Sequence, residues 1–458
     1  ENLLSIGTNF KMYIERGQVF FDITPIRATF TPLTNPFTTG AAGSSVVTTT
    51  IAAHGAITGD FVTFSGSAAV DGILAATLNA EFQVTVLSAS IFTFTATACS
   101  AGGVTGGGAA VSAAFQVQTG PTVAISGVGW GTGAWGRGGW GRASSGSAAV
   151  TVGLRQWVGA SFGQDFICSI RDGGIYYWPA SGGSISTLLA TRATALSAQP
   201  GASNAPVVAD NLLVTDDQHV VIVGTNPIGS IVEDPMLVRW CAQGNPLNWT
   251  PAITNTAGDQ RLTAGSYTYA VKVMRQENLI WTDSALISMQ FVGPPVMFSF
   301  NTLADNISVA SINAVAVANN IAYWMGKDKF FVYNGKVDTL PCDVRKYVFG
   351  GMNTTQLAQV HAGGNAQFNE VTWWYPAANS LVCDRYVTYN YLENLWTFGT
   401  MTRSAWLDSP LRSTPMAAGT DGLSISSAAA LLAFYDPIRL AGDMTVLDTI
   451  SNGRVSYV

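Results

Sequence analysis

Residues 166–178 read Phe-Ile-Cys-Ser-Ile-Arg-Asp-Gly-Gly-Ile-Tyr-Tyr-Trp, two apolar runs on either side of Asp172-Gly-Gly174. An Asp-Gly pair between two apolar runs is typical of a tight β-hairpin, because both residues tolerate the backbone angles that such turns need. This stretch therefore predicts an antiparallel hairpin, and it is the first of a series of similar patterns along the chain.

Four further hairpin patterns follow, at residues 212–223, 270–282, 314–325 and 370–398. Successive units lie roughly 40–60 residues apart, which is the repeat length of propeller blades. A propeller closes many short antiparallel strands into a ring and so leaves few unpaired strand edges. We therefore predict a β-propeller-like domain over residues 121–420. Two separate β-sandwiches would fit the same strands and stay open as the alternative.

Composition agrees with an all-β fold. Of the 458 residues, 48% are hydrophobic and only 11% are charged, and glycine occurs 48 times. Apolar content this high excludes a disordered chain, and long runs with helical periodicity are almost absent. The net charge of −6 offers no basic surface for gripping nucleic acid. A neutral or acidic wall would, however, suit a passage through which nucleic acid must move without sticking.

A separate small module is predicted at residues 38–120, after a first hairpin or hairpins in residues 1–37. Charged residues nearly vanish between Thr38 and Gln118, and the segments 61–64, 82–86, 91–95 and 114–117 alternate as short strands do. About five or six such strands suit a β-sandwich or a small barrel. The predicted fold class is thus all-β, with a propeller-like main domain and an inserted small sandwich or barrel. The last segment, residues 421–458, has no predicted structure.

The stretch 127–142 places a tryptophan at every fifth position among glycines. Spacing by five fits neither a strand nor a helix face, so a glycine-bent loop is predicted. Tryptophan and arginine are enriched at interface hot spots, which makes the loop a candidate docking site toward another subunit. A cover for a hydrophobic edge of the same chain explains it equally well. The candidate interface residues are Trp130, Trp135, Trp140, Arg137 and Arg142.

No catalytic, cofactor-binding or metal-binding residue is predicted. The five cysteines are scattered without a Cys-x-x-Cys pair, which favours free thiols over a zinc site. His54, His219 and His361 stand outside any recognised catalytic motif and are expected to be surface or hydrogen-bonded residues. Carboxylate pairs such as Asp216-Asp217 and Glu233-Asp234 are explained by turn formation. We therefore expect no enzymatic activity.

Three segments together resemble the tail nozzle, or tail tubular, proteins of short-tailed bacteriophages. They are Tyr13–Gly17 with Phe21–Arg27, the Gly/Trp loop, and Asp172–Trp178. The resemblance implies a homohexamer with one propeller per subunit, attached below the portal and adaptor rings. It also implies that this hexamer forms the end of the DNA-ejection channel and offers sites for a fibre or plug protein.

The expected role is accordingly that of a structural virion protein of the tail, assembled in the host cytoplasm, with viral DNA passing transiently. No apolar run approaches the about 18 residues of a membrane-spanning helix, and the chain does not open with a secretory signal pattern. The rival roles are a receptor-binding or carbohydrate-degrading phage tail protein, and a cellular propeller that acts as a docking scaffold.

Overall fold

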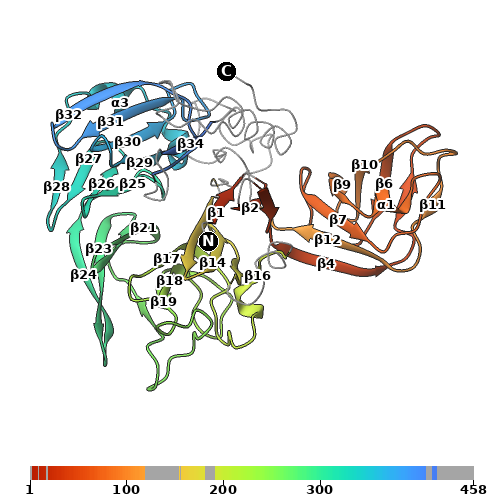
Figure 1. The fold of residues 1–458 in the computed structure, drawn as a ribbon, viewed down its shortest axis with the longest axis horizontal. Coiled ribbons are helices and arrows are strands. Elements are labelled where there is room, and N and C mark those ends of the chain that lie inside the picture. The colour runs from red at the N-terminus through yellow and green to blue at the C-terminus, as the bar shows by residue number, and fades with distance from the viewer. Residues whose placement is uncertain are drawn as a thin grey trace, which may run out of the picture. The chain divides into compact units, whose positions relative to one another are not determined.

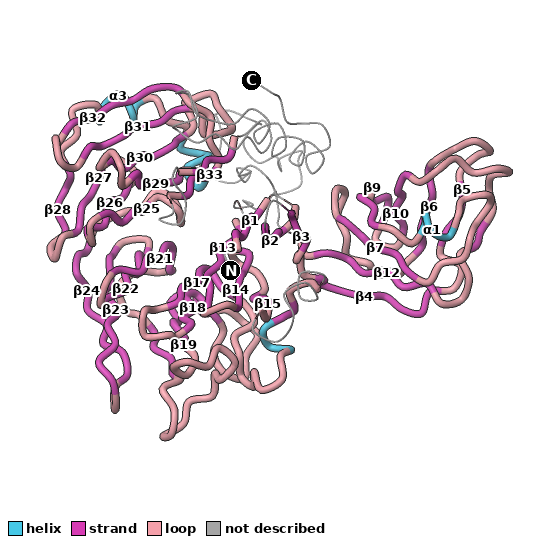
Figure 2. The backbone as a smooth tube through the Cα atoms, in the orientation of Figure 1, coloured by secondary structure: helices cyan, strands magenta, loops and turns pink. Residues whose placement is uncertain are grey.

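The computed structural model describes residues 3–8, 10–16, 19–118, 154, 156–180, 191–408 and 415–419. Nearly all of the ordered elements are β-strands, as Figures 1 and 2 show. Contacts divide the chain into two compact units. The first comprises residues up to Glu15, 20–119 and 178–194, and the second comprises the remainder. The predicted Gly/Trp loop with its five candidate interface residues, and residues 421–458, lie outside the described residues.

The first unit begins with a three-stranded sheet in the order β1-β2-β3. Its strands are β1 (Leu4–Gly7), β2 (Met12–Arg16) and β3 (Val19–Asp22). Met12 and Ile14 are buried while their neighbours are partly exposed, which is the period-two pattern of a strand with one covered face. The hairpin predicted near the start of the chain is therefore present, and contacts group most of it with the small module.

The small module is a β-sandwich. One sheet has the order β11-β5-β6-β10-β9 and the other the order β4-β12-β7-β8. The elements of the module are β4 (Ile26–Leu33), β5 (Phe37–Thr39), β6 (Val46–Thr50), β7 (Phe61–Ser65), α1 (Ala75–Leu78), β8 (Glu81–Gln83), β9 (Thr85–Ser88), β10 (Ile91–Thr95), β11 (Thr105–Gly106) and β12 (Val111–Gln116). Buried phenylalanines from both sheets, among them Phe37, Phe64 and Phe115, form its core.

Two details of the module differ from the sequence prediction. β4 pairs with β12, so the module starts at Ile26 rather than at residue 38. Residues 82–86, expected as one strand, divide between β8 and β9, which belong to different sheets. Val84, at the break, is buried in the core. Alternation along a strand cannot reveal this change of sheet, because the side chains keep alternating on both sides of the break.

An ion-pair network around Glu81 ties segments of the first unit together. The Glu81 carboxylate accepts hydrogen bonds from Lys11, from Gln116 and from Arg192, the last at 3.2 Å. Arg192 also donates to Asp22 at 3.1 Å. These contacts join residues far apart in sequence, and the half-buried setting makes them stronger than fully exposed pairs.

Among its described residues, the second unit contains five four-stranded antiparallel sheets in chain order. Their strands are β13 (Trp157–Phe162), β14 (Asp165–Ile170), β15 (Ile175–Trp178) and β16 (Thr194–Ala195); β17 (Ala209–Val214), β18 (Val220–Thr225), β19 (Asp234–Trp240) and β20 (Gly258–Arg261); β21 (Thr268–Met274), β22 (Glu277–Thr282), β23 (Ala285–Gly293) and β24 (Met297–Asp305); β25 (Val315–Ala318), β26 (Ile321–Met325), β27 (Phe330–Tyr333) and β28 (Val337–Leu340); and β29 (His361–Asn365), β30 (Glu370–Tyr375), β31 (Arg385–Asn390) and β32 (Leu395–Thr400).

A two-stranded sheet, β33 (Ala405–Leu407) with β34 (Met416–Ala418), follows the fifth sheet. Short helical segments connect some of the strands, at η1 (Leu196–Ala198), α3 (Arg345–Gly350) and η2 (Thr354–Gln359). Every sequence-predicted hairpin of this region is confirmed as a strand pair. The long β23–β24 hairpin was not predicted.

The five sheets are arranged as propeller blades. The first strand of each sheet contacts the first strand of the next, from β13 through β17, β21, β25 and β29. Large aromatic side chains fill the space between successive sheets. Trp281 packs edge-on against Trp324 with ring centroids 5.4 Å apart, and Phe330 lies 5.0 Å from Trp373. This packing buries a face of each sheet against its neighbour, and it confirms the all-β, propeller-like prediction rather than two separate sandwiches.

Candidate functional site

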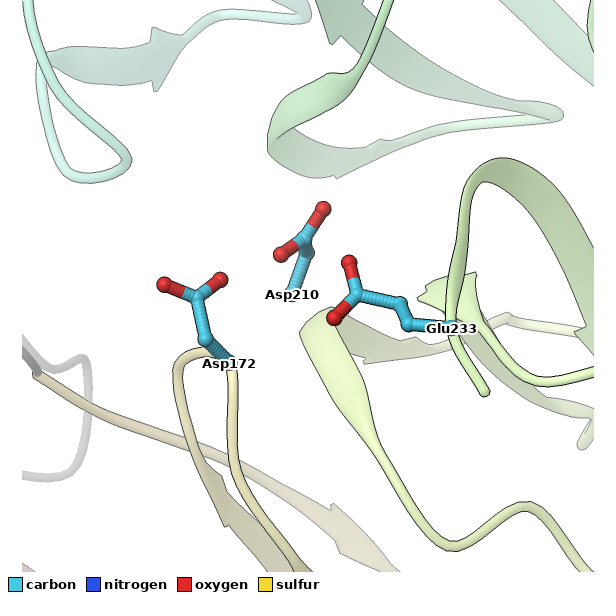
Figure 3. Close-up of side chains that lie close together, drawn as sticks. All are labelled: Asp172, Asp210 and Glu233. Carbon is cyan, nitrogen blue, oxygen red and sulfur yellow. The ribbon is translucent and has the colours of Figure 1, made fainter. Parts of the chain in front are cut away.

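Three carboxylates from the first two blades converge on one point (Figure 3). Asp172 occupies the turn between β14 and β15 with φ 54°. Asp210 is the second residue of β17, and Glu233 immediately precedes β19. Their nearest carboxylate oxygens all lie within 4.8 Å of one another. Because β17 is the inner strand of its blade, the cluster lies at the junction of two blades rather than on an isolated loop.

Asp210 is the enclosed member of the cluster, with only 4% of its surface exposed. The Thr268 hydroxyl donates a hydrogen bond to its Oδ2 at 3.3 Å. On the next strand, Gly224 has φ 60° and lies where the pairing of β18 with β19 shifts register. A Cβ at residue 224 would fall 2.1 Å from Asp210 Oδ2. Only glycine allows the backbone to bulge this close to the carboxyl group.

The electrostatics of the cluster favour a bound proton. Burial raises the pKa of Asp210 well above its usual range, and its hydrogen bond with Asp172 and the nearby charges of Glu233 and Asp172 add to the rise. Burial and the charge of Asp172 also raise the pKa of Glu233. Carboxylates this close do not all ionise together near neutral pH. Asp210 is therefore the protonated partner that can donate to Asp172.

Arg171 borders the cluster. Arg171 Nε lies 3.9 Å from Asp172 Oδ1, and the Arg171 guanidinium is 4.5 Å from the ring centroid of Tyr269. Tyr269 also lines a pocket of about 110 Å³ that includes Tyr267, Asp283 and Lys327. The carboxylate oxygens of the cluster are ligands that a hard divalent cation such as Ca²⁺ accepts, so a cation could take the place of the shared proton.

Sequence reasoning missed this cluster. Asp172 was interpreted as a turn residue, which its positive φ confirms, and Glu233 was given the same interpretation together with Asp234. Asp210 was not singled out at all. No spacing signal links the three, because each comes from a different strand or turn and only the packing of two blades brings them together.

The histidines have packing roles. His54 accepts a hydrogen bond from the Ala56 N–H on Nδ1 at 3.0 Å, and its Nε2 lies 3.1 Å from the Ser88 carbonyl oxygen. The His219 ring lies 5.1 Å and 5.0 Å from the rings of Phe291 and Phe298. His361 stacks on Trp374 at 5.1 Å, and burial lowers its pKa to about 4. All three are buried, and none belongs to the carboxylate cluster.

All five cysteines have free thiols, and each lies in a different part of the fold. Cys99, Cys168, Cys241 and Cys383 are buried, and Cys342 is partly buried. Burial raises the pKa of the Cys168, Cys241 and Cys383 thiols to about 12 and that of Cys342 to about 11. Thiols held in this protonated form are poor nucleophiles and poor metal ligands.

Two carboxylates outside the cluster, Asp234 and Asp328, form local contacts. Asp234 Oδ1 accepts from the Met236 N–H at 3.1 Å, and its Oδ2 accepts from Arg261 at 2.7 Å. Asp328 pairs with Arg345 at 3.4 Å on the surface. Within the described ranges, no helix has the length and apolar character needed to cross a membrane.

No family model and no curated protein matches this sequence. Among solved structures, Hsv2 of Kluyveromyces marxianus is 8% identical with a TM-score of 0.34, over 59% of this chain and 70% of that one. Hsv2 of Kluyveromyces lactis is 12% identical with the same TM-score, over 60% and 75%. The endosialidase of phage phi92 is 10% identical with a TM-score of 0.22; it covers 93% of this chain, which in turn spans 60% of that protein. Scores this low carry no functional argument, and the fold assignment rests on the sheets themselves.

Proposed function

We propose that this chain is a structural subunit of a short bacteriophage tail, a nozzle protein that assembles as a homohexamer around the path of the viral DNA. The observation that carries the proposal is the combination of an all-β propeller unit with a separate β-sandwich module in one chain. One propeller in each subunit is what the resemblance described above implies. The low charge content and the net charge of −6 also suit a wall along which DNA slides.

The aromatic packing supports a mechanical role. Buried tryptophan, tyrosine and phenylalanine side chains pack between the described blades, and the histidines serve as packing residues rather than as exposed acid–base groups. A ring of such subunits would be stiff because well-packed aromatic cores deform little. A tail component that transmits DNA under pressure needs this stiffness more than it needs catalysis. The adaptor and the fibre or plug proteins would be its partners in the virion.

Mass measurement and negative-stain imaging of the purified protein test this proposal. We expect six copies in a ring with an axial opening. A stable monomer, or a trimer without an opening, would count against it.

The proposed contacts of Trp130, Trp135 and Trp140 are tested in the same assay by replacing all three with alanine, which should weaken the ring. Leu74→Ala with Leu87→Ala, two exposed leucines of the small module, is the matched control. A triple tryptophan variant with unchanged oligomer mass would remove those residues from the interface.

A carbohydrate-degrading tail protein is the second candidate, because the cluster pairs a protonated carboxyl group with an exposed carboxylate, as glycosidases do. The geometry disfavours it. Asp210 is buried and bonded to Thr268, so a polysaccharide could reach Asp172 but not Asp210. The test is whether the wild-type protein releases reducing ends from bacterial polysaccharides and whether Asp172→Asn abolishes this release. Both results together would favour the carbohydrate-degrading function over the nozzle function.

A further inference from the structure

The β23–β24 hairpin extends beyond its own sheet. Its two strands have nine residues each and are the longest that the structure describes. Pairing of β23 with β22 ends at Met289, whereas pairing with β24 continues to Gly293. Four residues at 3.3 Å per residue carry this two-stranded ribbon about 13 Å beyond its pairing with β22. Figure 1 shows this ribbon reaching past the ends of the neighbouring strands.

The base of the ribbon is firmly mounted on the preceding blade. Phe291 and Phe298 lie opposite each other on the two strands, and both pack on His219 of the second blade. Trp240 adds an edge-on contact with Phe298 at 5.1 Å. The ribbon is therefore held in one direction by aromatic contacts, which distinguishes it from an unattached loop.

The tip has no polar side chain. Residues 292–297 read Val-Gly-Pro-Pro-Val-Met, and no charged residue occurs anywhere from Ser284 to Ala304. Val292 is 55% exposed and Val296 is 63% exposed. The two prolines have no N–H group, so the turn presents fewer backbone donors that would need a partner in an apolar medium.

A second uncharged loop lies at the same end of the second blade. The connection between β19 and β20, residues 241–257, contains no charged residue, and its Ile253 is fully exposed. This connection starts directly after Trp240, the residue that contacts the base of the ribbon. Both connections join the third and fourth strands of their sheets. Two neighbouring blades thus present exposed aliphatic side chains without charge.

We propose that residues 292–297 insert into the apolar layer of a lipid bilayer surface, with Ile253 as a secondary contact. A protein partner would be expected to meet a rim of hydrogen-bonding side chains around the apolar centre, and residues 292–297 offer no polar side chain. A bilayer needs only apolar side chains and few unpaired backbone donors, both of which are present. The proposal stands independently of the proposed nozzle function, since it concerns the isolated chain.

Flotation of the full-length protein with neutral phosphatidylcholine vesicles tests this inference. The net charge of −6 gives no attraction to anionic lipid, so binding should be equal on neutral vesicles and on vesicles with added phosphatidylglycerol, and insensitive to salt. Val292→Asp with Val296→Asp should lower the bound fraction at least about tenfold, because two charges replace two inserting side chains. Both positions are exposed, so the variant should melt like the wild type.

The matched control is Leu74→Asp with Leu87→Asp, which changes two leucines with 66% and 64% exposure on the small module. It should float like the wild type. Equal flotation of the tip variant and the wild type would overturn the inference, and so would failure of the wild type to float. A changed oligomer mass in the tip variant, without vesicle binding by the wild type, would assign the tip to a second copy of the chain instead.

Discussion

Gly224→Ala isolates the close approach of the β18 backbone to Asp210. At φ 60° the left-handed backbone alone destabilises an alanine by about 1 kcal/mol relative to glycine. Its Cβ would also lie 2.1 Å from Asp210 Oδ2 and 2.6 Å from Asp210 Cβ, so the buried carboxyl group must move.

The displaced Asp210 side chain would lose the hydrogen bond from Thr268, about 1 kcal/mol. It would also push into a packed blade junction, which destabilises by about 1–3 kcal/mol. The free energy of unfolding should therefore fall by about 3–5 kcal/mol in total, equivalent to a decrease in melting temperature of about 6 °C for a unit of this size.

Gly229→Ala is the matched control, because Gly229 has φ 80° and open space where the Cβ would stand. It should lose only about 1 kcal/mol. Calorimetry and urea titration of both variants give the comparison. In an Asp210→Gly background, which removes the Cβ as well as the carboxyl group, Gly224→Ala should cost no more than Gly229→Ala, because every clashing atom of residue 210 is gone. Equal losses for the two glycines in the wild-type background, or a full Gly224→Ala loss in the Asp210→Gly background, would refute the reasoning.

Three further predictions concern titrating or paired groups. The pKa of Asp210 is raised in the folded state, so the stability that this carboxyl group contributes is fully present below its unfolded pKa of about 4 and is lost as pH rises toward the raised pKa. Melts between about pH 5 and pH 8 should therefore show a flatter profile for Asp210→Asn, and parallel profiles would contradict this. The pKa of His361 is lowered to about 4, so its contribution to the free energy of unfolding is fully present above about pH 6.5 and is lost as pH falls through the folded-state pKa. His361→Gln should therefore reduce the loss of stability on acidification. An unchanged loss would assign the acid sensitivity to other groups. Glu81→Gln removes the carboxylate charge that pairs with both Lys11 and Arg192, so urea titration should show the first unit destabilised by about 1–3 kcal/mol. The loss should be smaller at high salt, which screens these ion pairs. A loss independent of salt would show that the charge is unimportant.

Local chemistry was enough to predict most of the hairpins. At Asp172-Gly173-Gly174 the turn residues and the flanking apolar runs lie within a dozen positions, and the strands β14 and β15 form where expected. The same holds for Asn319-Asn320, which both adopt positive φ between β25 and β26. Such turns depend on a few adjacent residues, so they can be read from sequence.

Features that depend on packing between distant segments could not be predicted. The carboxylate cluster forms because β17 lies beside the β14–β15 hairpin, and nothing near Asp210 in the sequence signals this neighbour. The β23–β24 ribbon was missed because a mostly apolar segment such as Ala285–Gly293 does not reveal how far its pairing extends past the rest of the sheet. The pairing of β4 with β12 likewise joins the first and the last strand of the module, which are far apart in the sequence.

Because the five cysteines lie in different parts of the fold, the reactivity of each thiol reports whether that part has opened. Cys99 belongs to the small module, Cys168 to the first blade and Cys241 to the second, while Cys342 and Cys383 flank the strands of the fourth and fifth blades. A maleimide applied in rising denaturant would modify each of the four buried thiols only when its own blade or module opens to solvent. Mass mapping of the modified peptides would then give the order in which the blades loosen, without any engineered label.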